Sequence, residues 1–347
     1  MVIKLTSYSS IPRRCDRAKA YLYLKDWTNK FLQTKNPKRK QDITKVLLSA
    51  AFNNHYVEGC ANTLNVCGQT VRNHLKQQDP NRLLQVNQQI IHEMKKKGAL
   101  SKPLTLAVDW HDEMYYGDPK AEGVVGAMPK NGSFFAYRFA TISVLLNGER
   151  LTLATVPMLD RCIFLHVKHL LDCVFELGLS IELLLFDRGY FSTELINYLN
   201  GSKIKFIMHM PWHREALKPA TDMLYTTTSH KKTRVEQASF RVVAVEQNGR
   251  VLVFATNTSF RRRKLHRLFR KRWGIETSYR LIGLFLAKTT SKLYVLRRLY
   301  FFLGVVLYNL WVLWNFRRRR HTPAYALKYN VRLFLVLSLL ADLEACG

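Results

Sequence analysis

Short apolar segments typical of buried strands alternate with helical segments between residues 104 and 208, and this alternation constrains the fold more than any other feature. Segments 133–146 and 150–156 are joined by Asn147-Gly148, a dipeptide typical of tight hairpin turns. Further strands are expected at 104–108, 181–186 and 204–208, and helices at 167–177 and 192–199. The pattern predicts an α/β fold in which an antiparallel start is followed by β-α-β units, giving a mixed sheet with flanking helices.

The rest of the chain divides by composition. Residues 1–100 have a polar, helical pattern, and Ser101-Lys102-Pro103 is a plausible boundary. Residues 101–210 then form the first part of the α/β core. Residues 211–259 begin polar and continue with two strand-like segments around Asn248-Gly249, which predicts a β-rich insertion. Residues 260–347 are helical and very basic, and we expect them to complete the core and to form C-terminal helices.

The charge balance restricts the partners. The chain of 347 residues has 54 Lys and Arg against 25 Asp and Glu, a net charge of +29. Such an excess favours a polyanion, with nucleic acid first and an anionic membrane surface second. The apolar run 299–314 has 16 residues, fewer than the ~20 needed to cross a bilayer, so a buried helix and no membrane partner are expected. No apolar leader and no CxxC pair are present, so we expect a cytoplasmic, nucleoid-associated protein with free thiols.

A helix-turn-helix pattern lies within residues 57–77. Val71 and Leu75 would face inward on its second helix. The remaining side chains would face outward and are of types that contact base edges and phosphates: Gln69, Thr70, Arg72, Asn73 and Lys76. A plain helical hairpin has the same pattern, and the global charge favours the DNA-binding interpretation.

Two acids directly follow apolar strand segments. Asp109 follows Leu-Thr-Leu-Ala-Val, and Asp187 follows Leu-Leu-Leu-Phe. Ligand sites collect at strand ends in open sheets, so neighbouring strands would let both carboxylates bind one hard cation. An acid in this place is also a common turn or cap residue. Asp112 and Glu113 are alternatives for the first ligand, and the strand-end position favours Asp109.

The third candidate acid is Glu276, on an expected helix whose inward stripe also holds Arg272, four residues earlier. A buried Arg–Glu ion pair explains both residues. The functional alternative assigns Glu276 to a metal and Arg272 to a phosphate. Three carboxylates can hold two Mg²⁺ ions, which activate a water or a 3′-hydroxyl and stabilise the departing oxygen.

The set Asp109, Asp187 and Glu276 resembles the acid triad of DDE transposases encoded by insertion sequences, in the ribonuclease H-like, retroviral-integrase-like superfamily. Three motifs carry the resemblance: Asp109-Trp-His-Asp-Glu-Met-Tyr-Tyr-Gly117, Phe186-Asp187-Arg-Gly-Tyr-Phe, and Arg272-Trp-Gly-Ile-Glu276, which is similar to the signature Tyr-x2-Arg-x3-Glu-x6-Lys. It implies a ribonuclease H-like mixed sheet with a β-rich insertion before the last acid. It also implies a DNA transposase that cuts insertion-sequence ends and joins the 3′-OH to target DNA, using two Mg²⁺ ions per site or Mn²⁺ as substitute.

The resemblance also implies partners. These are the terminal inverted repeats of the element, target DNA, and a second copy of the chain in a synaptic complex. Besides the helix-turn-helix, the expected DNA contacts are Arg188, Arg272, Arg280 and Lys288. Phe269 and Gly283 replace the signature Tyr and Lys. The alternatives are a nuclease of the same fold without strand transfer, and an inactive DNA-binding derivative.

Overall fold

The computed structural model describes residues 14–146, 148–160, 162–211, 221–230, 235–247, 249–319 and 321–344. The chain forms two compact units. The first contains the described residues up to Arg82, Ile282–Thr290 and the described residues from Leu299 onward. The second contains Leu83–Leu281 and Ser291–Arg298. The second unit therefore holds both strand-end acids and the whole sheet.

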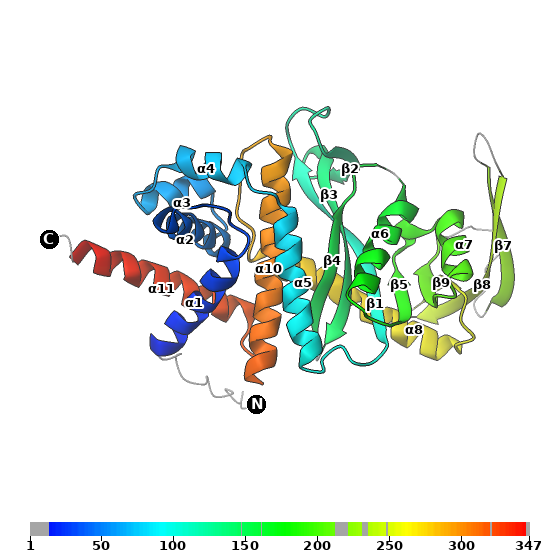
Figure 1. Ribbon diagram of the computed structural model, residues 1–347. Coiled ribbons are helices and arrows are strands. Elements are labelled where there is room, and N and C mark those ends of the chain that lie inside the picture. Colours follow the sequence, from blue (N-terminus) through cyan, green and yellow to red (C-terminus); the bar gives the residue numbers. More distant parts are fainter. Residues whose placement is uncertain are drawn as a thin grey trace, which may run out of the picture. The chain divides into compact units, whose positions relative to one another are not determined.

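The helices and strands are numbered in chain order, and Figure 1 labels most of them. The helices are α1 (Arg14–Asn29), α2 (Pro37–Asn53), α3 (Val57–Thr63), α4 (Gly68–Lys76), α5 (Asn81–Lys96), α6 (Ile163–Glu176), α7 (Thr193–Gly201), α8 (Arg262–Arg270), α9 (Gly274–Gly283), α10 (Tyr294–Arg318) and α11 (Ala324–Glu344), with 3₁₀ turns η1 (Arg188–Tyr190) and η2 (Lys271–Trp273). The strands are β1 (Leu104–Tyr115), β2 (Val124–Lys130), β3 (Ser133–Leu146), β4 (Glu149–Pro157), β5 (Ile181–Phe186), β6 (Phe206–His209), β7 (Asp222–His230), β8 (Val235–Gln247) and β9 (Arg250–Thr256).

The described strands form one mixed sheet in the order β2-β3-β1-β5-β6-β9-β8-β7, with β4 also paired to β3. β3 is antiparallel to β1, β2 and β4, whereas β5 is parallel to both β1 and β6. The antiparallel start and the β-α-β units expected from the sequence are thus confirmed. The expected insertion is also β-rich, and β9 pairs with β6, so its strands extend the same sheet.

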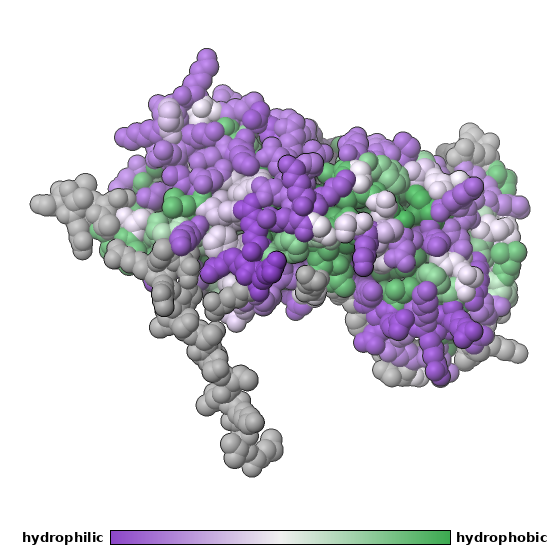
Figure 2. Space-filling model, turned by 60° about the horizontal axis from the view of Figure 1, so that its bottom comes forward, coloured by the Kyte–Doolittle hydropathy of each residue, from purple (hydrophilic) through white to green (hydrophobic). Residues whose placement is uncertain are grey.

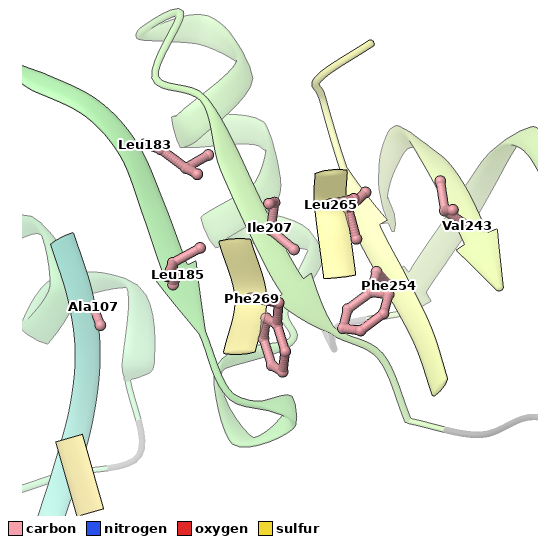
Figure 3. Packing of buried hydrophobic residues seen from close by; sticks show 8 residues of the cluster. All are labelled: Ala107, Leu183, Leu185, Ile207, Val243, Phe254, Leu265 and Phe269. Carbon is pink, nitrogen blue, oxygen red and sulfur yellow. The ribbon is translucent and has the colours of Figure 1, made fainter. Parts of the chain in front are cut away.

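α8 packs on one face of this sheet through a core cluster that Figure 3 shows. Leu265 and Phe269 of α8 contact strand residues that include Leu185, Ile207 and Phe254. α7 lies on the other face of the sheet. Phe240 and Val243 of β8 are three residues apart, so their side chains point to opposite faces, and Val243 belongs to the cluster with α8. Phe191, just before α7, packs on Phe240 and therefore lies on the face away from α8. α8 is therefore packed on the strands β1 and β5, which the candidate acids follow or interrupt.

The first unit is helical. α3 and α4 approach closely, because a Cβ on Gly68 would lie 3.2 Å from the backbone of Glu58, and Val71 and Leu75 of α4 are fully buried. Asn54, in a left-handed conformation after α2, donates from Nδ2 to the carbonyls of Gly283 and Leu286. Segment 282–290, which begins with the last two residues of α9, is therefore hydrogen-bonded to the turn that precedes α3.

α10 contains the long apolar run of the sequence. Among the described residues it is the one helix long and apolar enough to cross a membrane, and 89% of its most apolar 18-residue window is buried inside the protein. This burial agrees with the core helix that the sequence predicts.

Candidate active site

Asp109 and Asp187 lie side by side because their strands are parallel neighbours. Val108 of β1 pairs with Phe186 of β5, so the next residue on each strand is an acid at the same edge. β1 does not end at residue 108, as expected from its apolar run, but continues to Tyr115. Residues 109–115 remain in the sheet because they pair with β3, with Asp109 opposite Thr141. Asp109 therefore stands where the parallel pairing ends, inside a longer strand.

Arg272 connects the two carboxylates. Its Nη1 lies 3.3 Å from Oδ2 of Asp109, and its Nη2 lies 3.7 Å from Oδ1 of Asp187. The Arg272 side chain is 6% exposed and that of Asp109 16%, whereas that of Asp187 is 41% exposed. A buried guanidinium needs anionic partners, and the two acids provide them. The convergence of both carboxylates on one cationic group is the central geometric fact of this site.

The segment after Asp187 is shaped by close packing on Trp110. A Cβ on Gly189 would lie 2.2 Å from Cη2 of that indole, so glycine is required for the η1 turn in this arrangement. Tyr190 is fully buried, with its ring 4.8 Å from Trp110 and 5.6 Å from Phe186 between ring centroids. The sequence Asp187-Arg-Gly-Tyr is therefore a compact turn that fixes the acid at the strand end.

His209 is a neighbour of the acids that sequence reasoning missed. It follows Met208, which pairs with Phe186, so His209 stands beside Asp187 on the next parallel strand. Its Nδ1 lies 3.9 Å from Oδ1 of Asp187. Burial lowers the pKa of His209, although Asp187 acts in the opposite direction. The signal was available, since His209 also directly follows an apolar strand segment.

Tyr279 of α9 packs on the same face of β1 as Asp109. Its hydroxyl lies 2.7 Å from Oγ1 of Thr141, the residue opposite Asp109, and its ring stacks on His111 at 5.2 Å. Burial raises the pKa of Tyr279 well above its usual value and lowers that of His111 to about 4. Tyr279 lies three positions after Glu276 on α9, so its contacts hold the helix that carries Glu276 beside the acids.

The backbone of Glu276 lies within α9, while its side chain is outside the part of the structure that is described. Among the described side chains, no group of three His, Cys, Asp or Glu residues is close enough to hold a metal ion. The assignment of Glu276 as the third ligand therefore stays a prediction. So does its alternative, an ion pair with Arg272, although the described contacts of that guanidinium are with Asp109 and Asp187.

The two alternative acids on β1 have other surroundings. Asp112 forms a bidentate ion pair with Arg138, with distances of 2.6 and 2.8 Å to Nε and Nη2. Burial raises the pKa of Glu113 to about 7, although the nearby Arg297 acts to lower it. Neither carboxylate is paired with Arg272 in the described contacts. The geometry therefore favours Asp109 as the partner of Asp187.

The expected DNA-contacting side chains lie at several places. On α4, Gln69, Asn73 and Lys76 are exposed, Thr70 is half-buried, and Arg72 is half-buried at 4.0 Å from Glu58. Arg188 in η1, Arg280 in α9 and Lys288 are exposed, whereas Arg272 is buried and turned to the acids. Lys288 belongs to the first unit, where its backbone N–H donates to His55.

The segment 261–272 is strongly basic. Arg263, Lys264, Arg267 and Arg270 are exposed, while Leu265 and Phe269 anchor α8 in the core. Hydrophilic side chains are widespread on the face shown in Figure 2, with apolar surface between them. The exposed cations of α8 are followed directly in the sequence by η2, which contains Arg272 beside the acids.

Comparisons with known proteins add two findings. Residues 166–310 match the family described as "Transposase DDE domain". The structure is similar to a piggyBac transposase synaptic complex with hairpin DNA, solved by cryo-EM, with a TM-score of 0.53 and 9% identity, over 99% of this chain and 75% of that chain. At this identity the likeness is one of fold. No curated protein matches.

Proposed function

Because residues 166–310 match the family described as "Transposase DDE domain", we propose that the chain cuts the ends of an insertion sequence and joins the 3′-OH to target DNA by two-metal-ion phosphoryl transfer. The observation that carries this proposal is the meeting of Asp109 and Asp187 around a single cationic group, where the parallel pairing of β1 and β5 ends. Glu276 is the proposed third acid, on the helix docked beside them.

The residues fit a divalent cation. Carboxylate oxygens are the donors that Mg²⁺ prefers, and Arg272 shows that two carboxylates already face one position suited to a positive charge. When bound, Mg²⁺, or Mn²⁺ in its place, makes the attacking oxygen a better nucleophile and stabilises the departing 3′-oxygen. Asp109, Asp187 and Glu276 would hold two such ions.

The chain's own side chains orient the reaction. Asp109 accepts a hydrogen bond from the Trp110 backbone N–H, 2.9 Å from Oδ1, which fixes one carboxylate oxygen. The η1 turn, locked by Gly189 against Trp110, fixes Asp187. Preorganised ligands of this kind lower the barrier because they need little rearrangement during the reaction.

The proposed DNA path uses the basic surfaces. The exposed cations of α8 would position the backbone near the acids, and the outward side chains of α4 would contact the terminal repeats. Arg188, Arg280 and Lys288 are proposed backbone contacts. A homodimer in the synaptic complex, with DNA rather than a membrane as partner and a nucleoid location, completes the proposal.

The test is a cleavage and strand-transfer assay on the DNA that flanks the coding sequence, with Mg²⁺ or Mn²⁺. We expect wild type to cut and join, and Asp187→Asn to do neither while it still binds DNA. Asp172→Asn is the matched control, because the Asp172 side chain on α6 is 44% exposed, much like that of Asp187, and its described ion pair is with Lys168.

Each other outcome has a defined meaning. Normal cleavage by Asp187→Asn would refute the acid assignment. Cutting without joining by wild type would favour a nuclease of the same fold, and DNA binding without either reaction would favour a non-catalytic derivative.

A further inference from the structure

Arg272 occupies the position that the proposed function assigns to a divalent cation. We propose that Arg272 is a built-in counter-ion that keeps divalent-cation affinity low in the DNA-free protein until the DNA backbone withdraws its guanidinium. This inference rests on the proposed function, since it concerns the regulation of the same acids.

The contacts define a competition. Different nitrogens of one guanidinium reach Asp109 and Asp187, at 3.3 and 3.7 Å, and the side chain is almost fully buried. A divalent cation bound to the same two carboxylates would meet this fixed positive charge at short range, where little water screens it. Cation binding is therefore opposed for as long as Arg272 stays in contact with both carboxylates.

The position of Arg272 in the chain gives the guanidinium an alternative partner. It is the buried member of the basic segment 261–272, whose other cations are exposed or half-buried. Its residue lies in η2, a 3₁₀ turn between α8 and α9, and such turns rearrange more readily than α-helix. DNA along the exposed cations of α8 would bring phosphates near this turn, and Arg binds phosphate as well as carboxylate.

Phe269 anchors the backbone just before Arg272. It is packed in the core cluster of Figure 3, and the Arg272 guanidinium carbon lies 5.6 Å from the centroid of its ring. The backbone before η2 is thus anchored to the sheet, and a change of partner by Arg272 needs only rotation of its long side chain and adjustment of the turn.

Thermodynamic linkage predicts how DNA binding and cation binding affect each other. If DNA removes a group that competes with the cation, then DNA and cation strengthen the binding of each other by the same factor. The acids would acquire their ions chiefly when a DNA backbone is in place, which limits undirected cleavage.

The test measures Mn²⁺ binding without DNA, by the electron paramagnetic resonance signal of the free ion. We expect Arg272→Gln to bind Mn²⁺ about tenfold more tightly than wild type or better, within the range typical of such couplings. Arg270→Gln is the matched control, because it removes the same charge from an exposed side chain two residues away. We expect its affinity to stay within about threefold of wild type.

Stability provides a second readout. Arg272→Gln should melt at a lower temperature than wild type in EDTA, because Asp109 loses a buried partner. Saturating Mn²⁺ should raise its melting temperature more than that of wild type. If Arg272→Gln does not fold, Arg272→Met keeps an unbranched side chain of similar length without the charge, and its Mn²⁺ affinity should exceed that of wild type.

Affinity of the Arg272 variants equal to or weaker than that of wild type would overturn the inference. The double variant Asp109→Asn/Asp187→Asn separates this failure from failure of the proposed function. If it binds as many Mn²⁺ ions as wild type, the acids do not hold the cation and the proposed function fails. If it loses them but the Arg272 variants bind no more tightly, only the counter-ion role fails.

Discussion

The two neighbouring acids should differ sharply in their contribution to stability. Asp109 is 16% exposed and lies 3.3 Å from Arg272, whereas Asp187 is 41% exposed and lies 3.7 Å away. Removal of one partner from a buried ion pair costs about 3–5 kcal/mol, and an exposed pair is worth at most about 1 kcal/mol. Asp109→Asn keeps an acceptor for the Trp110 N–H and leaves Arg272 its contact with Asp187, so we expect a loss near the lower limit, about 3 kcal/mol.

The assay is thermal unfolding in EDTA, so that no divalent ion contributes. At about 2–4 °C for each kcal/mol, Asp109→Asn should lower the melting temperature by roughly 6–12 °C, and Asp187→Asn by at most about 4 °C. The double variant leaves Arg272 without either carboxylate and should lose more than the sum of the single losses. Equal losses for the single variants, or a larger loss for Asp187→Asn, would refute the burial argument.

Three further predictions follow from the structure. Burial raises the pKa of Glu113 to about 7, so the folded protein holds this proton more tightly than the unfolded chain. Glu113 therefore reduces the stability of the protein as the pH rises from about 4.5 to 7. The stability of Glu113→Gln relative to wild type, measured by urea unfolding, should rise over that interval and then level off. Gly189→Ala should lower both the melting temperature and DNA cleavage, because its methyl group would collide with Trp110; unchanged values would show that the turn can adjust. DNA affinity should fall steeply with salt, with a slope of about −0.9 for each phosphate contact, and Lys264→Gln should reduce the slope by about one; a flat response would exclude a backbone contact by α8.

The strands of the core could be predicted because their apolar runs are short, uninterrupted and bounded by turn residues. β5 has the expected bounds, and the helix α7 begins after Ser192, whose side chain accepts a hydrogen bond from the Leu195 N–H. The prediction for β1 is too short, since the segment from Asp109 to Tyr115 contains Asp109, Asp112 and Glu113 and lacks an apolar pattern. Only the long-range pairing with β3 keeps that segment in the sheet, and periodicity carries no such information.

The site was predictable in part for the same reason. Strand ends revealed Asp109 and Asp187, and the same pattern at His209 was overlooked. The role of Arg272 was not predictable from spacing. A separation of four residues from Glu276 indicated a helical neighbour, but the 3₁₀ turn η2 ends α8 at this point, and the guanidinium reaches acids far away in the sequence.

The central claim is that Asp109, Asp187 and Glu276 gather around the same divalent ions beside bound DNA. Fe²⁺ in place of Mg²⁺ reacts with added hydrogen peroxide to give Fe³⁺, hydroxide and a hydroxyl radical, and ascorbate reduces the Fe³⁺ again. The radicals cut the polypeptide near the ion, and the fragments can be mapped by mass spectrometry. We expect cuts near residues 109, 187 and 276 together, each suppressed by excess Mg²⁺ and by Asp187→Asn. Cuts near 109 and 187 without any near 276, or a pattern that Mg²⁺ does not suppress, would contradict the claim.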